Sequence, residues 1–438
     1  MRNLQRYLLI TSKFIWDSFE KFSDELFYQN ETKRYSYGQF LQKVIERASQ
    51  LQSTYSQHEK VSISLDSSLE SLVLFFTLLK INAIPVIISK QTLPKQITLL
   101  MNSIQDKKIL SENKATIIFT SGSSTTPKAI LHTFANHYYS ALGANANIAL
   151  QKKDRWLLSL PMHHIGGLSI IFRTLIVGGT LIGYDKTVSI EDTIAQNKVT
   201  HVSVVATQLQ RMLSYPKKLQ SLNMVLVGGG IVPDELIRKA LELNLPIYKT
   251  YGMSEMTSQV TTTSQGAKLE ELFTSGKILD YRELKISEDN EILVKGKVLC
   301  RNYLNAKINI DADGWFHTGD LGCVDSNNNL LVLGRKDRMF ISGGENIYPE
   351  PIEQIILEFE NLFEVCIVPK DNKEFGQVPV MFYKTKNSDE VLYIEFKEFL
   401  QNKLMPFQIP KEIFLFPKNY KPLDIKPNYK FLIEWLQK

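Results

Sequence analysis

A run of hydroxyl side chains after an apolar segment is the first place where this sequence could do chemistry. It reads Thr120-Ser121-Gly122-Ser123-Ser124-Thr125-Thr126-Pro127-Lys128 and follows the apolar residues Ile117, Ile118 and Phe119. Hydroxyls and backbone N–H groups can surround phosphate oxygens, Gly122 lets a backbone approach closely, and the ammonium of Lys128 adds a compact positive charge. The loop is not a G-x-x-x-x-G-K-[ST] loop, because a proline precedes the lysine and no Ser or Thr follows it. We therefore expect a phosphate-holding loop, with an ordinary solvated turn as the alternative for these residues taken alone.

The elements around this loop alternate between strand and helix. Short apolar runs predict strands at 61–65, 84–88, 115–120, 156–160, 202–205, 224–227 and 247–249, and helical periodicity predicts helices at 37–52, 69–82, 136–150 and 234–243. This rhythm indicates an α/β fold with mainly parallel sheets covered by helices. Ligands bind at the carboxyl ends of such strands. Two polar sequences start there, namely Gly228-Gly229-Gly230 and Thr250-Tyr251-Gly252-Met253-Ser254-Glu255.

The C-terminal part of the chain has a different character. From about Lys277 short strands and Asp/Asn-Gly turns predict a small β-rich subdomain. After Arg335 the pattern changes to a compact α+β tail, with helices at 351–359 and 389–404 and strands at 365–368, 378–383 and 413–416. We expect a large domain over residues 1–336 and a small mobile lid domain over residues 337–438.

Composition restricts the class of protein. The chain has 438 residues and a formal charge of +5, from 51 basic and 46 acidic residues spread along it, which does not specifically indicate nucleic acid. Its three cysteines form no C-x-x-C pair, so neither a disulfide framework nor a zinc site is expected and a cytoplasmic location fits. The apolar segment Ile165 to Tyr184 contains Arg173 and several glycines, which predicts a buried helix, a turn and a strand and no stable membrane insertion. The oligomeric state stays open.

The order of the motifs resembles the acyl-adenylate-forming superfamily, which contains acyl-CoA synthetases, peptide-synthetase adenylation domains and luciferases. The resemblance covers nearly the whole chain. The motifs occur in the family's order as Thr120 to Lys128, Tyr251 to Glu255, Gly314-Trp315-Phe316-His317-Thr318-Gly319-Asp320, Gly334-Arg335-Lys336-Asp337-Arg338 and Ser342-Gly343-Gly344-Glu345-Asn346-Ile347-Tyr348-Pro349. The family's reaction lets a carboxylate oxygen attack the α-phosphate of ATP while pyrophosphate leaves, so catalysis consists mainly of positioning and charge stabilisation.

The resemblance implies roles for these residues. Lys128 would hold the β- and γ-phosphates together with Thr120, Ser121, Gly122, Ser123 and Ser124, and Thr125 stands where the family usually has a second glycine. Glu255 would bind Mg²⁺, which prefers hard oxygen ligands, and Ser254 would contact phosphate in place of the commoner threonine. Tyr251 would lie against the adenine, and Gly228, Gly229 and Gly230 would let the backbone approach it. Asp320 would bind the ribose hydroxyls, with Arg335 in the same region.

Three further roles follow from the same resemblance. Asp337 would be the hinge about which the lid rotates between adenylation and thioester formation. Residues Ser342 to Glu345 would then line the passage for the pantetheine arm of CoA. The catalytic lysine of the lid is usually announced by Gly-Lys, and this chain has Asp424-Ile425-Lys426-Pro427 instead. We choose Lys426, with Lys430 and Lys421 as competitors, because a cation near the carboxylate and α-phosphate stabilises developing charge.

The segments Pro161 to Leu168, Thr200 to Arg211 and Thr250 to Val260 look closest to the o-succinylbenzoate-CoA ligases of menaquinone biosynthesis. This class joins CoA to the aliphatic carboxylate of a dicarboxylic aromatic acid. The aromatic carboxylate needs a cationic or donor-rich partner, and Arg211 is the candidate, with help from His164 and Thr257. Arg211 could instead be an exposed helix residue and His164 a packed core histidine.

The sequence thus predicts an AMP-forming acid–CoA ligase that uses ATP, Mg²⁺ and CoA. The alternatives are a synthetase for another aryl or medium-chain acid, and a nucleotide-binding module without catalysis. The second alternative is motivated by Thr125 and by the missing glycine before Lys426.

Overall fold

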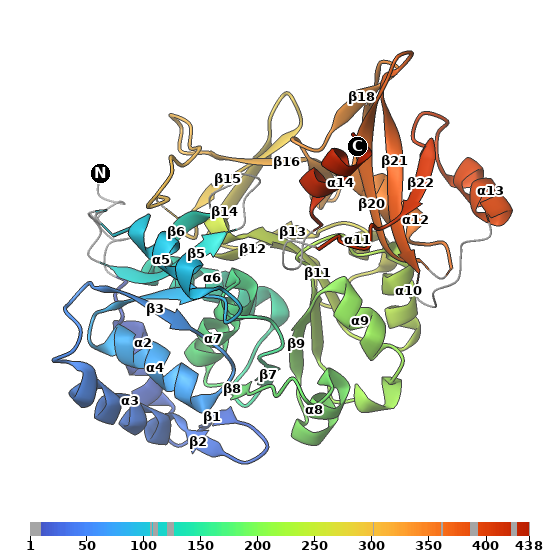
Figure 1. The fold of residues 1–438 in the computed structure, drawn as a ribbon. Helices are drawn as coiled ribbons and strands as arrows, with labels where there is room; N and C mark the ends of the chain where they lie inside the picture. Colours follow the sequence, from blue (N-terminus) through green and yellow to red (C-terminus); the bar gives the residue numbers. More distant parts are fainter. Residues whose placement is uncertain are drawn as a thin grey trace. The chain divides into compact units, whose positions relative to one another are not determined.

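The computed structural model describes residues 10–105, 107, 113–120, 127–300, 302–360, 362–385, 393–421 and 427–437 (Figure 1). The chain forms two compact units. The first unit contains residues 1–229, 240–284 and 294–316, and the second contains residues 230–239, 285–293 and 317–438.

The largest sheet of the first unit is built on parallel strands. Its order is β13-β12-β11-β10-β9-β7-β8-β1-β2. The six strands from β11 to β1 in that order run parallel to their neighbours, while β12, β13 and β2 pair antiparallel. The strands are β1 Leu26–Gln29, β2 Arg34–Ser36, β7 Arg155–Leu157, β8 Thr180–Ile182, β9 His201–Val204, β10 Met224–Val227, β11 Ile247–Met253, β12 Ser258–Thr262 and β13 Lys277–Ile278. The predicted α/β architecture is confirmed.

A second, four-stranded sheet of the first unit carries the phosphate-loop candidate. Its strands are β3 Lys60–Ser64, β4 Ile84–Ile88, β5 Lys114–Thr120 and β6 Lys128–Thr133. Strands β3, β4 and β5 are parallel, whereas β6 returns antiparallel to β5. The sequence did not predict β6, because its residues from Ala129 to Thr133 are all buried and show no alternation. The loop therefore joins two strands of a hairpin, and a helix begins only at Phe134.

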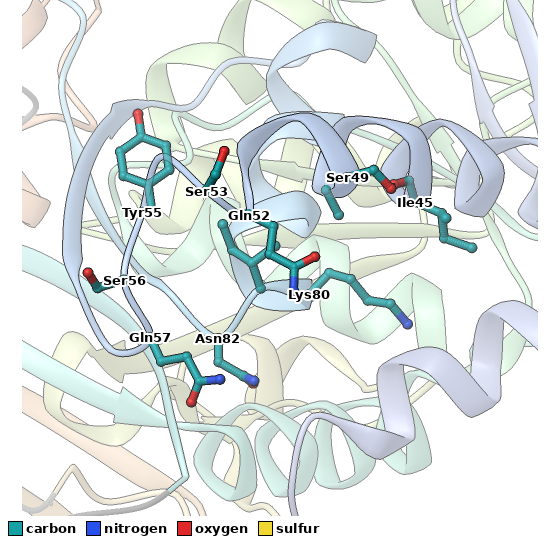
Figure 2. A pocket seen from close by; sticks show the side chains of 11 residues that line it. Ile45, Ser49, Gln52, Ser53, Tyr55, Ser56, Gln57, Lys80 and Asn82 are labelled. Carbon is teal, nitrogen blue, oxygen red and sulfur yellow. The ribbon is translucent and has the colours of Figure 1, made fainter.

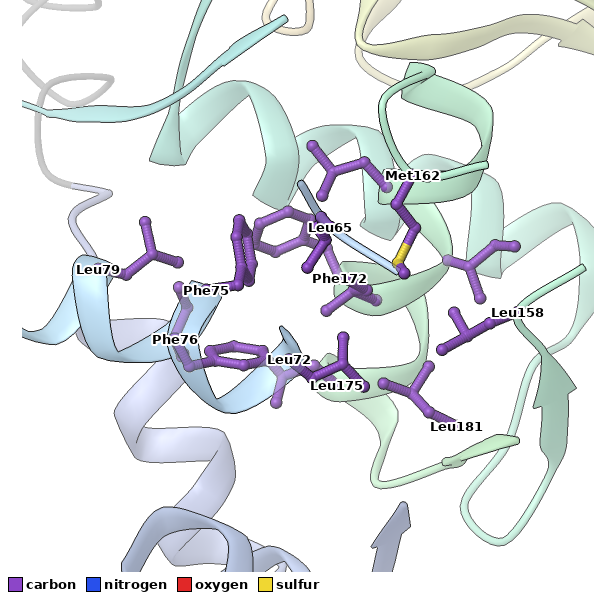
Figure 3. Close-up of a cluster of buried hydrophobic side chains, with 14 of the residues drawn as sticks. Leu65, Leu72, Phe75, Phe76, Leu79, Leu158, Met162, Phe172, Leu175 and Leu181 are labelled. Atoms are coloured by element: carbon purple, nitrogen blue, oxygen red, sulfur yellow. The ribbon is translucent and has the colours of Figure 1, made fainter. Parts of the chain in front are cut away.

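Helices of the first unit cover these sheets. They are α2 Lys13–Lys21, α3 Tyr37–Leu51, α4 Leu69–Lys80, α5 Pro94–Asn102, α6 Phe134–Ile148, α7 Ile165–Val177, α8 Ile190–Asn197, α9 Ala206–Met212, η2 Pro216–Lys218, η3 Ser254–Met256 and α11 Leu269–Leu272. Figure 3 shows how α4 and α7 meet, with Leu72, Phe75 and Phe76 facing Phe172 and Leu175. These side chains are almost fully buried, and each contributes about 1.5–3 kcal/mol when removed from water.

The segment with the length of a membrane span folds as a helix, a turn and a strand, as predicted. Helix α7 ends at Val177, Gly178 takes a left-handed φ of 77°, and β8 begins at Thr180. Arg173 is 1% exposed within α7, and burial lowers its pKa to about 9. In the described part of the chain, no helix has the length and apolarity needed to cross a bilayer.

The β-rich subdomain expected after Lys277 is present as a four-stranded sheet in chain order. Its strands are β14 Arg282–Ile286, β15 Glu291–Gly296, β16 Phe316–Val324 and β17 Leu330–Arg335. Strands β16 and β17 pair antiparallel with Asp320 opposite Arg335. The motif residues of both strands are therefore brought side by side by the register of one hairpin.

The second unit contains a five-stranded sheet with its own apolar core. Its strands are β18 Phe340–Ser342, β19 Glu345–Ile347, β20 Leu362–Asn372, β21 Gly376–Thr385 and β22 Glu412–Leu415. The helices of this unit are α12 Pro349–Ile356, α13 Tyr393–Lys403 and α14 Tyr429–Leu436. Helix α10, Asp234–Glu242, belongs to this unit only over residues 234–239. Ile352, Ile367 and Met381 are buried between α12 and the sheet, and Leu432 of α14 is buried against Phe382. The α+β character predicted for the tail is confirmed.

Candidate active site

The two described ends of the phosphate-loop candidate lie side by side. Thr120 is the last residue of β5 and Lys128 the first of β6, and the two are paired across the hairpin. Both side chains are half-buried. Ser121, Gly122, Ser123, Ser124 and Thr125 lie outside the described residues. The hairpin therefore presents a hydroxyl and an ammonium at the same edge of the sheet, where the loop begins and ends.

The metal-ligand candidate Glu255 lies in a tight reversal between β11 and β12. The reversal consists of η3 followed by Thr257 and Ser258, whose φ angles of 50° and 102° are unusual for side chains with a Cβ. The carbonyl of Ser254 accepts a hydrogen bond from Nε2 of His132 at 2.7 Å. Burial lowers the pKa of His132 to about 4, so the ring stays neutral with its proton on Nε2. A buried side chain of strand β6 thus anchors the reversal between β11 and β12.

A tyrosine that the sequence analysis did not single out touches both candidates. The hydroxyl of Tyr303 donates a hydrogen bond of 2.6 Å to Oε1 of Glu255, and Nζ of Lys128 lies 5.0 Å from the centre of its ring. Burial raises the pKa of Tyr303, and the neighbouring carboxylate raises it further, so the phenol remains a donor. Tyr303 is 48 residues from Glu255 in sequence, and no local pattern announces this contact.

The chemistry of these residues fits a magnesium ion. Oε2 of Glu255 accepts no hydrogen bond from any side chain or backbone group in the described part of the chain. Mg²⁺ is usually bound by one or two carboxylates plus substrate phosphates and water. Consistent with such a sparse protein contribution, the described residues contain no group of three or more His, Cys, Asp or Glu side chains placed to hold a metal. Glu255 could hold the ion from one side while a phosphate between Thr120 and Lys128 held it from the other.

The residues predicted to contact the adenine lie on or directly after neighbouring strands of the nine-stranded sheet. Gly228 and Gly229 follow β10, and Tyr251 lies on β11 beside a bulge at Gly252. A Cβ on Gly228 would stand 2.7 Å from the carbonyl oxygen of Thr250, so the two strands approach too closely for any other residue. Gly230 is the first residue of the second unit.

Two of the acid-binding candidates also follow parallel strands. His164 precedes α7 as its N-cap, half-buried, with its ring centre 4.4 Å from that of His163. Arg211 is exposed in the last turn of α9, the helix that follows β9. Since β7, β9 and β10 are parallel, the loops after them meet at one edge of the sheet. Thr257 is fully buried, and its hydroxyl donates to the carbonyl of Val298 at 2.7 Å, so its contact with an acid stays a prediction.

The second unit brings the ribose and hinge candidates together. Nη1 of Arg335 donates to Oδ1 of Asp320 at 3.0 Å, and its Nε donates to Oδ1 of Asp337 at 3.0 Å. Burial lowers the pKa of this guanidinium, but the two carboxylates outweigh burial and raise it. Arg335 therefore links the acceptor predicted for the ribose to the residue predicted as the hinge.

Lys426 lies outside the described residues, and the segment after it is anchored in the second unit. Of its competitors, Lys421 is exposed, and Lys430 is 76% exposed with only a 3.8 Å approach to Glu434. The guanidinium of Arg338 stacks 3.7 Å from the ring centre of Tyr429 and pairs with Glu350 at 2.9 Å and Glu353 at 2.6 Å. Arg338 ends the motif Gly334 to Arg338, and the resemblance to the family implies no role for it.

A separate cavity of about 540 Å³ opens at the ends of α3 and α4 (Figure 2). Gln52, Tyr55, Lys80 and Asn82 are among its lining residues. None of the predicted site residues lines it.

Comparison with known proteins identifies the family. A model of the family described as "AMP-binding enzyme" matches residues 91–307 of this chain. A 2-succinylbenzoate–CoA ligase of a Geobacillus species is 36% identical over 343 residues, which are 73% of this chain and 69% of that protein. This chain belongs to the AMP-binding enzyme family. The resemblance inferred from the order of its motifs is therefore confirmed.

Two further relatives extend the comparison. The 2-succinylbenzoate–CoA ligase of Bacillus cytotoxicus is 36% identical over 355 residues, which are 76% of this chain and 72% of that enzyme. The solved structure of the o-succinylbenzoate coenzyme A synthetase MenE from Bacillus subtilis in complex with AMP has a TM-score of 0.85 at 25% identity, covering 96% of this chain and 97% of that one. The fold of this AMP-binding enzyme thus extends through both units.

Proposed function

We propose that this AMP-binding enzyme joins 2-succinylbenzoate to CoA in two steps, in menaquinone biosynthesis. In the first, an oxygen of the aliphatic carboxylate attacks the α-phosphate of ATP, the bond to the β-phosphate breaks, and pyrophosphate leaves. In the second, the thiol of CoA loses its proton and attacks the acyl carbonyl carbon, and AMP leaves. The observation that carries the proposal is the alignment of most of the chain with 2-succinylbenzoate–CoA ligases.

The described residues suit the first step. Bound Mg²⁺ supplies positive charge to the phosphates. Glu255 supplies a carboxylate held in place by Tyr303, and Lys128 supplies an ammonium at the end of the phosphate loop. Ser121, Gly122, Ser123 and Ser124 complete this loop in the proposal, and Ser254 adds a hydroxyl beside the metal ligand. Lys426 brings a second cation to the reacting carboxylate and α-phosphate.

The second step requires the active site to exchange its contacts. In the proposal, residues 1–336 are the large domain and residues 337–438 rotate as a lid about Asp337, which removes Lys426 and admits the thiol. The hairpin turn between β18 and β19 supports this role for Ser342 to Glu345, because Gly343 and Gly344 both have positive φ, at 59° and 90°. Such a turn leaves no side chain at its tip that could obstruct a narrow pantetheine arm.

Recognition of the aromatic carboxylate belongs to the loops after β7 and β9. Arg211 is exposed in the last turn of α9, the helix that follows β9, and its guanidinium can bind a carboxylate with two parallel hydrogen bonds. His164 and Thr257 complete this subsite in the proposal. Free cysteines at positions 300, 323 and 366 support a cytoplasmic location.

A substrate panel with detection of the thioester tests the proposal. We expect 2-succinylbenzoate to be turned over in preference to benzoate and to medium-chain fatty acids. Arg211→Ala should lower kcat/KM for 2-succinylbenzoate by about 10- to 100-fold, the value of a hydrogen bond to a charged group. Arg47→Ala, on the exposed face of α3, is the matched control and should leave it unchanged.

Two results would refute parts of this reading. Preferential turnover of another acid would replace the substrate while leaving the reaction class intact. Binding of ATP without any acid-dependent exchange of pyrophosphate would identify a nucleotide-binding module without catalysis.

A further inference from the structure

Residues Tyr303 to Asn305, which we call the strap, connect the two halves of the phosphate site within the first unit. At one end, the hydroxyl of Tyr303 reaches Oε1 of Glu255 at 2.6 Å, and its ring lies under Nζ of Lys128. Tyr303 is 6% exposed, so both contacts are largely shielded from water. The backbone of Glu255 is held as well, because its carbonyl accepts a hydrogen bond of 2.7 Å from the N–H of Cys300.

The other end of the strap holds the residues where the phosphate loop ends. Oδ1 of Asn305 accepts a hydrogen bond from the N–H of Ala129 at 2.8 Å, and its Nδ2 donates to the carbonyl of Pro127 at 2.9 Å. The N–H of Leu304 donates to the carbonyl of Ala129 at 2.9 Å. The amide of Asn305 therefore spans the peptide units on both sides of Lys128, much as a neighbouring strand would.

We propose that the strap is a positioning element that sets the distance between the metal carboxylate and the phosphate-binding lysine. The inference rests on the proposed function, since it takes Glu255 as the ligand of magnesium and Lys128 as a ligand of phosphate. Tyr303 engages Oε1 and thereby leaves Oε2 to the metal. Asn305 fixes the backbone from which Lys128 projects. A hydrogen bond to a metal-binding carboxylate orients it and tunes its affinity for the ion.

The two ends of the strap predict different defects. Tyr303→Phe keeps the buried ring and the contact with Lys128 but loses the hydroxyl, so it should act only where the metal is bound. Asn305→Ala releases the backbone on both sides of Lys128, so it should weaken nucleotide binding whether or not magnesium is present. A merely structural role of the strap would instead produce the same defect in both variants.

Calorimetric titration of the full chain with ATP, in magnesium and in EDTA, separates these cases. For Tyr303→Phe we expect the gain in ATP affinity that magnesium brings to fall by about tenfold, with affinity in EDTA unchanged. Binding of Mn²⁺ in the presence of ATP, followed by electron paramagnetic resonance, should weaken in parallel. For Asn305→Ala we expect the same fractional loss of ATP affinity in both buffers. Tyr35→Phe is the matched control, because its ring on β2 also lies under a lysine, with Nζ of Lys43 at 5.1 Å.

A double-mutant cycle decides whether the hydroxyl acts through the carboxylate. In a Glu255→Gln background, adding Tyr303→Phe should cause little further loss of Mn²⁺ affinity; fully additive losses would overturn the proposal. Wild-type metal dependence in Tyr303→Phe, or a magnesium-specific defect in Asn305→Ala, would overturn it too. If the wild-type chain itself bound ATP with no dependence on magnesium, the proposed function would fail first, which distinguishes the two failures.

Discussion

The buried charge cluster at Arg338 allows a quantitative prediction about the second unit. Arg338 is 10% exposed and pairs with Glu350 and Glu353, of which Glu353 is 2% exposed. Arg338→Met keeps most of the volume but leaves two carboxylates without their cation. Removing one partner of a buried pair costs about 3–5 kcal/mol, because the remaining charge stays buried and uncompensated. We expect the free energy of opening of the second unit to fall by that amount.

A second ion pair of the same length, but more exposed to water, provides a control. Lys370 pairs with Glu412 at 2.6 Å, the distance that separates Arg338 from Glu353, and the two side chains of this pair are 36% and 38% exposed. Exposed pairs contribute about 0–1 kcal/mol, so Lys370→Met should cost little. The difference between the two variants isolates the effect of burial on an ion pair of fixed length.

Hydrogen exchange of the amides in β20 and β21 is the appropriate assay, because a chain of two units need not unfold in one step and exchange reports each unit separately. Burial already raises the pKa of Glu350, and Arg338 opposes that rise. Without the guanidinium the folded-state pKa should rise further above the unfolded value. A raised carboxyl pKa means that stability is lost as pH increases from the unfolded pKa through the folded one, so the deficit of Arg338→Met should shrink in acid. Equal costs for Arg338→Met and Lys370→Met, or a deficit that grows in acid, would refute this reasoning.

Two more predictions concern catalysis and pH. Lys426→Ala should lower the rate of adenylation, measured by pyrophosphate exchange, by about 10²–10³-fold, because the variant loses one group that stabilises charge in the transition state. The rate of thioester formation from supplied acyl-adenylate should fall far less. Equal losses in both steps would move the assignment to another lysine. His132, whose pKa burial lowers to about 4, contributes stability that is present above its unfolded pKa and is lost as pH falls. Between about pH 7 and about pH 5 this loss amounts to roughly 2 kcal/mol, and His132→Gln, which retains a donor for the carbonyl of Ser254, should remove it from urea titrations at the two pH values. An unchanged pH dependence in that variant would contradict the burial argument.

Much of the fold was predictable because the relevant signals are local. The apolar runs 84–88 and 224–227 coincide with β4 and β10, since strands buried on both faces usually consist of a continuous apolar run. The glycines and Arg173 within the segment 165–184 correctly predicted a helix, a turn and a strand. Strand β6 was missed for the opposite reason. Its buried residues include the polar His132 and Thr133, and only its pairing with β5 identifies them as part of a strand.

The candidate site divides in the same way. The residues proposed to carry chemistry, such as Glu255, Lys128 and Asp320, lie in compact motifs that a sequence displays directly. Residues that position them do not, because Tyr303 and Asn305 act on partners 48 and 176 residues away. Their side chains have no chemistry of their own to announce, and their spacing from the motifs depends on the intervening loops.

This division has a physical origin in how such a reaction is catalysed. A carboxylate and a triphosphate repel one another, and small displacements of the groups that neutralise them cost much of the rate, since the benefit of a cation depends on where it is held. The effect of each cation on the rate therefore depends on the residues that hold it in place. In the first unit a tyrosine and an asparagine hold the groups that we propose face the phosphates. In the second, Arg338 contacts Tyr429, the residue at which α14 begins after Lys426. Substitution of a support should thus lower activity while every chemical group remains in the chain, and the metal dependence of Tyr303→Phe measures that effect directly.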